Sequence, residues 1–405
     1  MLKVKDSFLI FVALVFTSKY MILSVTETST YFVLLASVIL LVLFIRKKLV
    51  MRKGSLYEQL GLFTFIFTFL LFNISKFFGE LTIANAIIPT GMVLILMVFV
   101  PFFFDKKTLK ESLLLYSNFN SLLLLIGLFV FILSLAGIIH SDVLVHASDH
   151  ANPEGYVSLY GLAYYPSWFK ISLSGLGYYR FSGAFWEPGT LGLYLVVLIT
   201  IEISIFYSTS YWSKYRIAIY LAAGFSSLSM LFISAMFILL LFFGFSKINN
   251  KKFLTFIFIF IFLAVFALIY FYDDIYKLVL YRLDFDSQRG FVGNNRSGVI
   301  SAFIYQFSNA SVLQQLIGAG PYVEFDGDPT SFVIKIMQRG IMGFSLLLLS
   351  FILFCVNRIN KHIIFAWIFS LAILCQFEGA IFLLILSTLI LNEKNKDKYQ
   401  LQEVH

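Results

Sequence analysis

The sequence predicts an all-α fold, a polytopic transmembrane helical bundle of about twelve helices with two large external loops. Three observations support this prediction. Of the 405 residues, 60% are hydrophobic and only 13% are charged, whereas a soluble domain is nearer half apolar and a quarter charged. Apolar runs of about twenty residues, long enough to cross a bilayer as helices, recur from end to end. Short basic clusters separate these runs.

The apolar spans follow one another along the whole chain, so we treat residues 1–405 as a single integral membrane domain. The spans are expected at 8–25, 28–45, 57–78, 81–104, 112–139, 189–208, 217–245, 253–272, 332–355 and 363–391. The first span has no small-residue cleavage site and leads directly into the second. We therefore expect a retained helix there, and not a signal peptide.

Lysine and arginine gather between the spans, and the positive-inside rule places such clusters in the cytoplasm. The clusters are Lys3 and Lys5; Arg46, Lys47, Lys48, Arg52 and Lys53; Lys106, Lys107 and Lys110; Lys214 and Arg216; Lys247, Lys251 and Lys252; Arg358 and Lys361; and Lys394, Lys396 and Lys398. Because 217–245 and 363–391 have basic clusters on both sides, each must turn back. We expect turns near 224–230 and 375–380, and both termini in the cytoplasm.

The net charge of +8 is a feature that nucleic-acid-binding proteins share. Here the charge is divided among short clusters between apolar spans, which is the distribution that membrane topology requires. We therefore expect membrane lipids as surroundings and no nucleic acid as a partner.

Two long segments, 140–188 and 273–331, hold most of the remaining polar residues and are expected on the external side. Long loops in compact chains are usually functional or disordered. The first contains the aromatic stretch YVSLYGLAYYPSWF at 156–169, which argues against disorder. These rings are either membrane-interface anchors or the lining of a sugar-binding groove, and composition favours anchors.

The stretch YYRFSGAFWEPGTLGLYL, residues 178–195, ends the first external loop and enters a span. Pro188 suits the first turn of a helix, and Glu187 stands at the cap position before it. The positive end of this helix, together with Arg180 nearby, forms a predicted anion site. Glu187 could pair with Arg180 or act as a base. The alternative is that Arg180 reaches lipid headgroups and Glu187 only caps the helix.

The second loop adds three arginines spaced seven apart, Arg282, Arg289 and Arg296. Glycine and asparagine interrupt any helix that would align them, and we expect an amphipathic helix to begin at about 296. Its apolar stripe would be Val299, Ile300, Phe303, Ile304 and Phe307. Asp326 and Asp328 have a spacing that can hold a divalent metal, but a turn is the preferred interpretation.

Several motifs resemble one family. The stretch RFSGAFWEPGTLG at 180–192 resembles the Arg-x-x-Gly-x-Phe-x-Glu-Pro segment of Wzy-type polymerases, which join O-antigen or capsular repeat units. NRSG at 295–298, LIGAG at 316–320 and DPTSFVIKIMQRGIMGFSLLLL at 328–349 are similar to the second loop and following helix of the wider O-antigen polymerase and ligase group. The ligase branch commonly has a histidine where this chain reads Asp328-Pro329-Thr330-Ser331, which argues against a ligase.

The resemblance implies a metal-independent glycosyltransferase without a cofactor in a bacterial inner (plasma) membrane. A hydroxyl of one undecaprenyl-pyrophosphate-linked repeat would attack the anomeric carbon of a growing lipid-linked glycan, and the lipid pyrophosphate would leave. Guanidinium groups suit the pyrophosphate, and we expect Arg180, Arg289 and Arg296 there, with Arg282 as a weaker candidate. A carboxylate would serve as base: Glu187 first, Asp328 second, with His146 as a weaker, secondary candidate. A chain-length regulator and a flippase are possible partners.

The alternatives are a lipid-linked oligosaccharide flippase or transporter, an O-antigen ligase, and a scaffold that binds polysaccharide without chemistry. Transporters tend to have internal repeats and interrupted helices, and no internal repeat is evident in this sequence. Glu202 lies deep within a predicted span, where a charge is a functional hypothesis by default. The sequence identifies no partner for it.

Overall fold

The computed structural model describes residues 5–18, 20, 29–46, 55–74, 99–141, 143–145, 155–167, 170–173, 176–185, 187–207, 209–246, 285–286, 290–291, 297–320, 331–356 and 379–391. The chain is mostly helical. The helices are α1 (Asp6–Thr17), α3 (Ser29–Arg46), α4 (Leu56–Ile74), α7 (Lys106–Leu135), α8 (Pro188–Ile201), the π-helix η2 (Glu202–Phe206), α9 (Ser213–Ser226), α10 (Met230–Ser246), α13 (Ser297–Asn309), α14 (Val312–Ile317), α15 (Ser331–Cys355) and α17 (Gly379–Leu391).

Three helices in the described ranges are long and apolar enough to cross a membrane. They are Lys106–Leu135, Pro188–Phe206 and Ile336–Cys355. The segments Asp6–Thr17 and Tyr31–Arg46 are shorter apolar helices. These helices agree with the prediction of a membrane protein, and each overlaps a span expected from the sequence. Within the first expected span, 8–25, α1 ends at Thr17, and residues 19 and 21–25 lie outside the described residues.

The distribution of polar and apolar side chains suits an apolar surrounding. The outer face of α3 exposes Leu35, Val38, Leu41, Val42 and Ile45. In contrast, Ser117, Asn120 and Glu202 are completely buried. Buried hydroxyls in these helices donate to carbonyls of the preceding turn, as Thr200 does to Val196 at 2.9 Å. This local bond satisfies a polar group that would otherwise be costly to bury.

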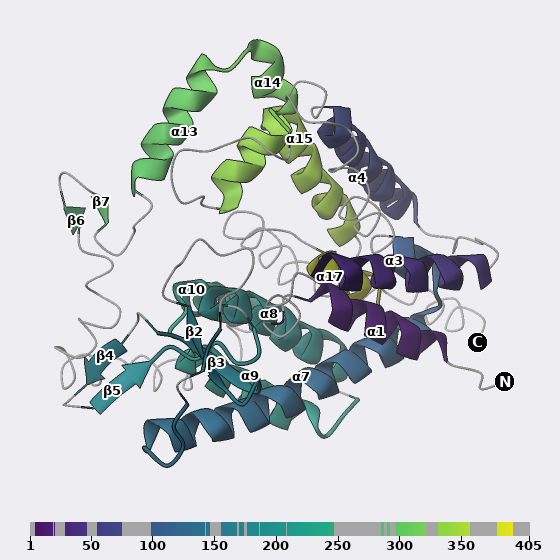
Figure 1. The fold of residues 1–405 in the computed structure, drawn as a ribbon. Helices are drawn as coiled ribbons and strands as arrows, with labels where there is room; N and C mark the ends of the chain where they lie inside the picture. The colour runs from purple at the N-terminus through teal and green to yellow at the C-terminus, as the bar shows by residue number, and fades with distance from the viewer. Residues whose placement is uncertain are drawn as a thin grey trace.

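The helices pack in two neighbourhoods (Figure 1). In one, α1 lies between α3 and the long helix α7, and α8 is in contact with α9, α10 and α17. In the other, α15 packs along α4 and against α14, with α13 beside it. A continuous core of aromatic and aliphatic side chains runs through α1, α7, α8 and α17. Residues 181–185 take part in this core, because Phe181 and Phe185 are fully buried.

The span at 217–245 divides into two helices, as the charges on both its flanks predict. α9 ends at Ser226 and α10 begins at Met230, so the turn falls within the expected 224–230. Leu228 adopts a positive φ of 46° there. The amphipathic helix expected from about 296 is also present as α13, and Ile304 of its apolar stripe is 60% exposed. The predicted division of 363–391 is not tested, because only α17 falls within the described residues.

The all-α prediction holds for the described parts of the spans but not for the segments 140–188 and 273–331, which contain short antiparallel strands. The strands are β1 (Leu144–Val145), β2 (Tyr156–Leu159), β3 (Ala163–Pro166), β4 (Lys170–Leu173), β5 (Leu176–Tyr179), β6 (Phe285–Asp286) and β7 (Gly290–Phe291). They pair as β1-β2-β3, β4-β5 and β6-β7. Tyr160 and Gly161 both have positive φ at the β2–β3 turn, as a tight hairpin requires. Aromatic and β-branched residues in 156–166 favour strands.

Helix α15 is interrupted at Gly340, whose φ of 67° and ψ of 174° are not helical. The LIGAG segment fits into this break. The backbone N–H of Ala319 donates to the carbonyl of Met337 at 2.8 Å, and that of Gly320 donates to Gln338 at 3.2 Å. Carbonyls next to a helix break need such external donors. The two motifs at 316–320 and 328–349 therefore meet in space, and the span expected at 332–355 consists of two helical pieces.

Candidate functional site

The segment 180–185 is held on two sides by backbone hydrogen bonds. On one side, the N–H of Ser182 donates to Tyr164 at 2.9 Å, and the N–H of Tyr164 donates to Gly183 at 2.8 Å. On the other side, the N–H of Phe181 donates to the carbonyl of Ser226 at 3.1 Å. The segment therefore lies between the β2–β3 hairpin and the C-terminal end of α9. These contacts fix the backbone that carries Arg180.

The structure explains why the Arg-x-x-Gly motif has glycine at position 183. Gly183 has a φ of 57°, a conformation that glycine adopts without strain. A Cβ at this position would lie 3.0 Å from the Cδ2 atom of Leu124 on α7. The turn after Arg180 therefore needs both the backbone freedom and the small size of glycine.

The half-buried side chain of Arg180 is anchored at the end of α9. Its Nε–H donates to the carbonyl of Ser227, the C-cap residue of α9, at 3.1 Å. A cation is favourable there because the C-terminal end of a helix carries partial negative charge. The contact fixes the position of the guanidinium relative to α9.

Glu187 is the N-cap residue of α8, and Pro188 follows at the start of the helix, as the sequence predicts. The carbonyl of Glu187 accepts from the N–H of Leu191 at 2.9 Å. Its carboxylate makes no side-chain capping bond, but Oε2 would lie 3.9 Å from a Cβ placed on Gly189. The carboxylate is therefore close to the positive end of α8, although it does not close the cap.

Tyr156 in β2 interacts electrostatically with both Arg180 and Glu187. Its side chain is buried, and burial raises the pKa of its hydroxyl. The negative charge of Glu187 raises this pKa further, whereas the positive charge of Arg180 lowers it. Both charges therefore act on the same phenol. Arg180 lies on the segment beside the hairpin, Glu187 stands at the N-terminus of α8, and both lie within electrostatic range of Tyr156.

Five of the seven predicted site residues lie outside the described residues. They are Arg282, Arg289, Arg296, Asp328 and His146. Their roles remain predictions. Within the described ranges, no group of three or more His, Cys, Asp or Glu side chains lies together.

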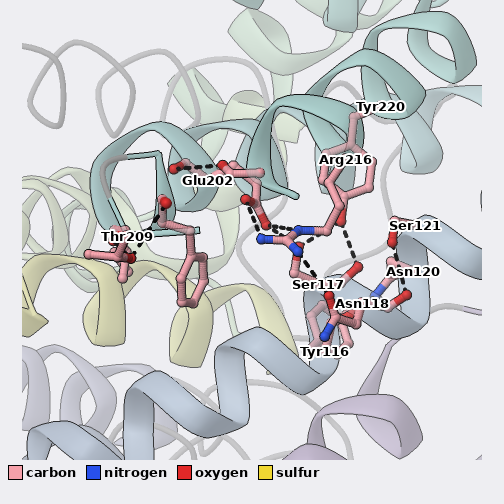
Figure 2. A network of polar contacts seen from close by, with 12 residues as sticks. Tyr116, Ser117, Asn118, Asn120, Ser121, Glu202, Thr209, Arg216 and Tyr220 are labelled. Atoms are coloured by element: carbon pink, nitrogen blue, oxygen red, sulfur yellow. Dashed lines mark hydrogen bonds and ion pairs between the residues drawn. The ribbon is translucent and has the colours of Figure 1, made fainter. Parts of the chain in front are cut away.

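A second polar cluster, which sequence reasoning did not find, surrounds Glu202 (Figure 2). Arg216 of α9 binds the Glu202 carboxylate with two nitrogens, Nε at 2.7 Å from Oε1 and Nη2 at 2.9 Å from Oε2. Its Nη1 donates to the Oδ1 of Asn118 at 3.0 Å. The Ser117 hydroxyl donates to Glu202 Oε1, and the guanidinium lies 5.8 Å from the ring centroid of Phe206.

The pair links η2 and α9, and its contacts with Ser117 and Asn118 add α7. The side chains are almost inaccessible, at 6% for Arg216 and 0% for Glu202. Glu202 begins η2, where the N–H of Tyr207 donates back five residues to Glu202 at 2.7 Å. Such π-helical turns are often associated with function. The sequence does contain a signal for this pair, because Glu202 and Arg216 flank the corner between η2 and α9. The basic-cluster prediction placed Arg216 on the cytoplasmic side and did not anticipate that its side chain is buried.

Polar contacts continue along α7 from this pair to the site segment. The hydroxyl of Tyr20 donates to the Oδ1 of Asn120 at 2.8 Å, and the hydroxyls of Ser18 and Tyr116 lie 2.7 Å apart. Tyr20 also forms an antiparallel bridge with Phe185, and their ring centroids are 4.9 Å apart. The site segment is therefore tied to Tyr20, beyond the end of α1, as well as to α9 and the hairpin.

Comparison of the chain with protein-family models, with curated proteins and with solved structures found no match in any of the three.

Proposed function

We propose that this protein is a polymerase that joins undecaprenyl-pyrophosphate-linked oligosaccharide repeat units at the outer face of a bacterial plasma membrane. The observation that carries the proposal is that Arg180, held at the end of α9, and Glu187, at the N-terminus of the apolar helix α8, both act electrostatically on Tyr156. The resemblance of residues 180–192 to Wzy-type polymerases supplies the reaction.

The arginine suits the leaving group of this reaction. As the anomeric carbon–oxygen bond breaks, negative charge develops on the pyrophosphate, and a guanidinium can bind two of its oxygens. Because Arg180 is fixed to the end of α9, it would need little rearrangement when that charge appears. Arg289 and Arg296 are proposed to join it from the second loop.

The carboxylate suits the attacking group. Glu187 would accept the proton of the acceptor hydroxyl as its oxygen forms the new bond to the anomeric carbon. The electrons of the broken bond leave with the lipid pyrophosphate, so the step needs no metal or redox cofactor. Asp328 is the second candidate for the base. Exposed Tyr160 in the hairpin turn, at 69% exposure, offers an aromatic surface for a sugar ring.

The proposed membrane topology follows from the lengths of the apolar spans and from the positive-inside rule. It comprises about twelve membrane helices, with both termini in the cytoplasm and with loops 140–188 and 273–331 outside. Arg180 and Glu187 would then face the outer leaflet, where a lipid-linked substrate is presented. The described apolar helices and the apolar outer face of α3 support a membrane location.

The test is reconstitution. Purified protein in lipid vesicles should convert purified lipid-linked repeat units into a ladder of longer glycans, and Arg180→Ala should not. A wild-type protein that leaves the repeat units unchanged would remove the basis for the proposal.

A flippase for lipid-linked oligosaccharides is the second candidate, favoured by one observation. Interrupted membrane helices are typical of transporters, and α15 is interrupted at Gly340 next to the buried Arg339. Deletion in cells separates the two functions. Loss of a flippase should block export of the repeat unit, whereas loss of a polymerase should leave single repeats displayed outside.

A further inference from the structure

One helical hairpin, formed by α8 and α9, holds both Glu187 and Arg180. α8 carries Glu187 at its N-terminal end and leads into η2, which begins at Glu202. α9 then returns and ends next to the site, where Ser227 holds Arg180. At about 1.5 Å per residue, Glu202 lies roughly 22 Å along α8 from Glu187, and Arg216 lies about 16 Å along α9 from Ser227.

The far end of this hairpin is closed by the Glu202–Arg216 pair. We propose that this pair is a positioning device, which sets the axial register of α9 against α8 and thereby the spacing between Arg180 and Glu187. The inference rests on the proposed polymerase function, because it concerns the geometry in which those two groups act. Neither Glu202 nor Arg216 is proposed to touch the substrate.

The geometry of the contact favours positioning over simple adhesion. Two parallel bonds from a planar guanidinium to one carboxylate define an orientation as well as a distance. Asn118 and Ser117 of α7 bind the same pair. The axial position of α9 is therefore fixed relative to α7 as well as to α8. Apolar side chains would hold α8 and α9 together without the cost of burying charges, but they would supply no directional bonds between the two helices.

The consequence for activity follows from helix geometry. A slip of α9 by one residue would move the Ser227 carbonyl by about 1.5 Å along the axis and turn it by about 100°. Arg180 would move with that carbonyl relative to Glu187. Displacements of about 1 Å in a catalytic arrangement can cost roughly 100-fold in rate.

The experiment compares elongation rates per folded molecule, measured on purified lipid-linked repeat units with wild-type protein and Arg180→Ala in the same assay. The charge-free double variant Glu202→Leu/Arg216→Met should insert and melt like the wild type but elongate about 100-fold more slowly. The exchanged pair Glu202→Arg/Arg216→Glu should be at least about tenfold faster than the charge-free variant. Wild-type elongation by the charge-free variant, or no gain from the exchanged pair when both are folded, would overturn the proposal.

Two single variants keep the test decisive if a double variant does not fold. Arg216→Lys retains the charge but loses the two-pronged contact, and it should lower the elongation rate per folded molecule about tenfold. Lys214→Met is the matched control, because Lys214 is an exposed cation two residues away, and its rate should be that of the wild type. A wild-type rate in Arg216→Lys would refute positioning. If wild-type protein makes no ladder, the polymerase function fails and positioning fails with it; a ladder with unaffected pair variants removes positioning alone.

Discussion

Replacing Gly340 by alanine tests the junction between the LIGAG segment and the break in α15. The backbone of Gly340, at φ 67° and ψ 174°, lies in a region that is essentially restricted to glycine, and other residues there cost about 1–3 kcal/mol. A Cβ would also lie 2.2 Å from the carbonyl oxygen of Leu316 and 2.5 Å from the nitrogen of Gly318. Both neighbours are backbone atoms, so α14 must move away.

This movement would break the two hydrogen bonds from Ala319 and Gly320 to the carbonyls before the break. At about 0.5–1.5 kcal/mol each, their loss adds about 1–3 kcal/mol to the backbone strain. The expected destabilisation by Gly340→Ala is therefore about 2–6 kcal/mol. One kcal/mol shifts the melting temperature by roughly 2–4 °C in a domain of 150–250 residues, and by less in a longer chain.

The assay is the thermal unfolding of detergent-purified protein, and we expect the midpoint for Gly340→Ala to fall by at least about 3 °C. Gly343→Ala is the control. It lies on the same helix, and the nearest atom to its added Cβ is a side-chain carbon of Arg339 at 3.1 Å. Equal melting temperatures for the two variants would refute the reasoning about the junction.

The remaining predictions concern the site and its membrane orientation. Arg180→Ala should abolish glycan elongation at an unchanged protein level, as measured by gel ladders and immunoblotting, and polymer of normal length would exclude a pyrophosphate role. Glu187→Gln should lower the elongation rate at least about 100-fold while the protein still binds lipid-linked repeats, since the amide keeps the shape but cannot accept the proton; a rate within twofold of the wild type would transfer the base role elsewhere. A tag inserted at 209–216 should be accessible from the cytoplasm and a tag at 150–160 from outside, and the reverse labelling would overturn the proposed topology.

The sequence predicted those features that depend on local composition. Apolar length located the described membrane-length helices, and charges on both flanks predicted the division of 217–245 into two helices. The Glu-Pro pair predicted the start of α8. These features follow from bilayer thickness, the positive-inside rule and backbone geometry, which can be read within about twenty residues.

The features that the sequence did not reveal depend on contacts between distant segments. Glu202 and Arg216 meet because η2 and the corner after it fold α9 back along α8. No periodicity links these two residues, and the clustering of Arg216 with Lys214 suggested a surface location. Similarly, Gly318 and Gly340 each allow a backbone contact with the other's segment. The need for glycine at these positions becomes evident only once α14 and α15 are packed.

The segment 140–188 contains features of both kinds. The described part of its aromatic stretch forms the strands β2 and β3, which pack with buried Tyr156, Leu159 and Ala163. Composition did not show that this hairpin would hold the segment of Arg180 through Tyr164. The pairing joins residues that lie on both sides of a second hairpin, β4–β5, and only tertiary structure brings them together.

The most direct test of the polymerase proposal is the elongation of purified lipid-linked repeat units by reconstituted protein, followed as a ladder on a gel. We predict a ladder with wild-type protein and single repeats with Arg180→Ala at an equal amount of folded protein. Unchanged repeats with both proteins, or the same ladder with both, would contradict the account.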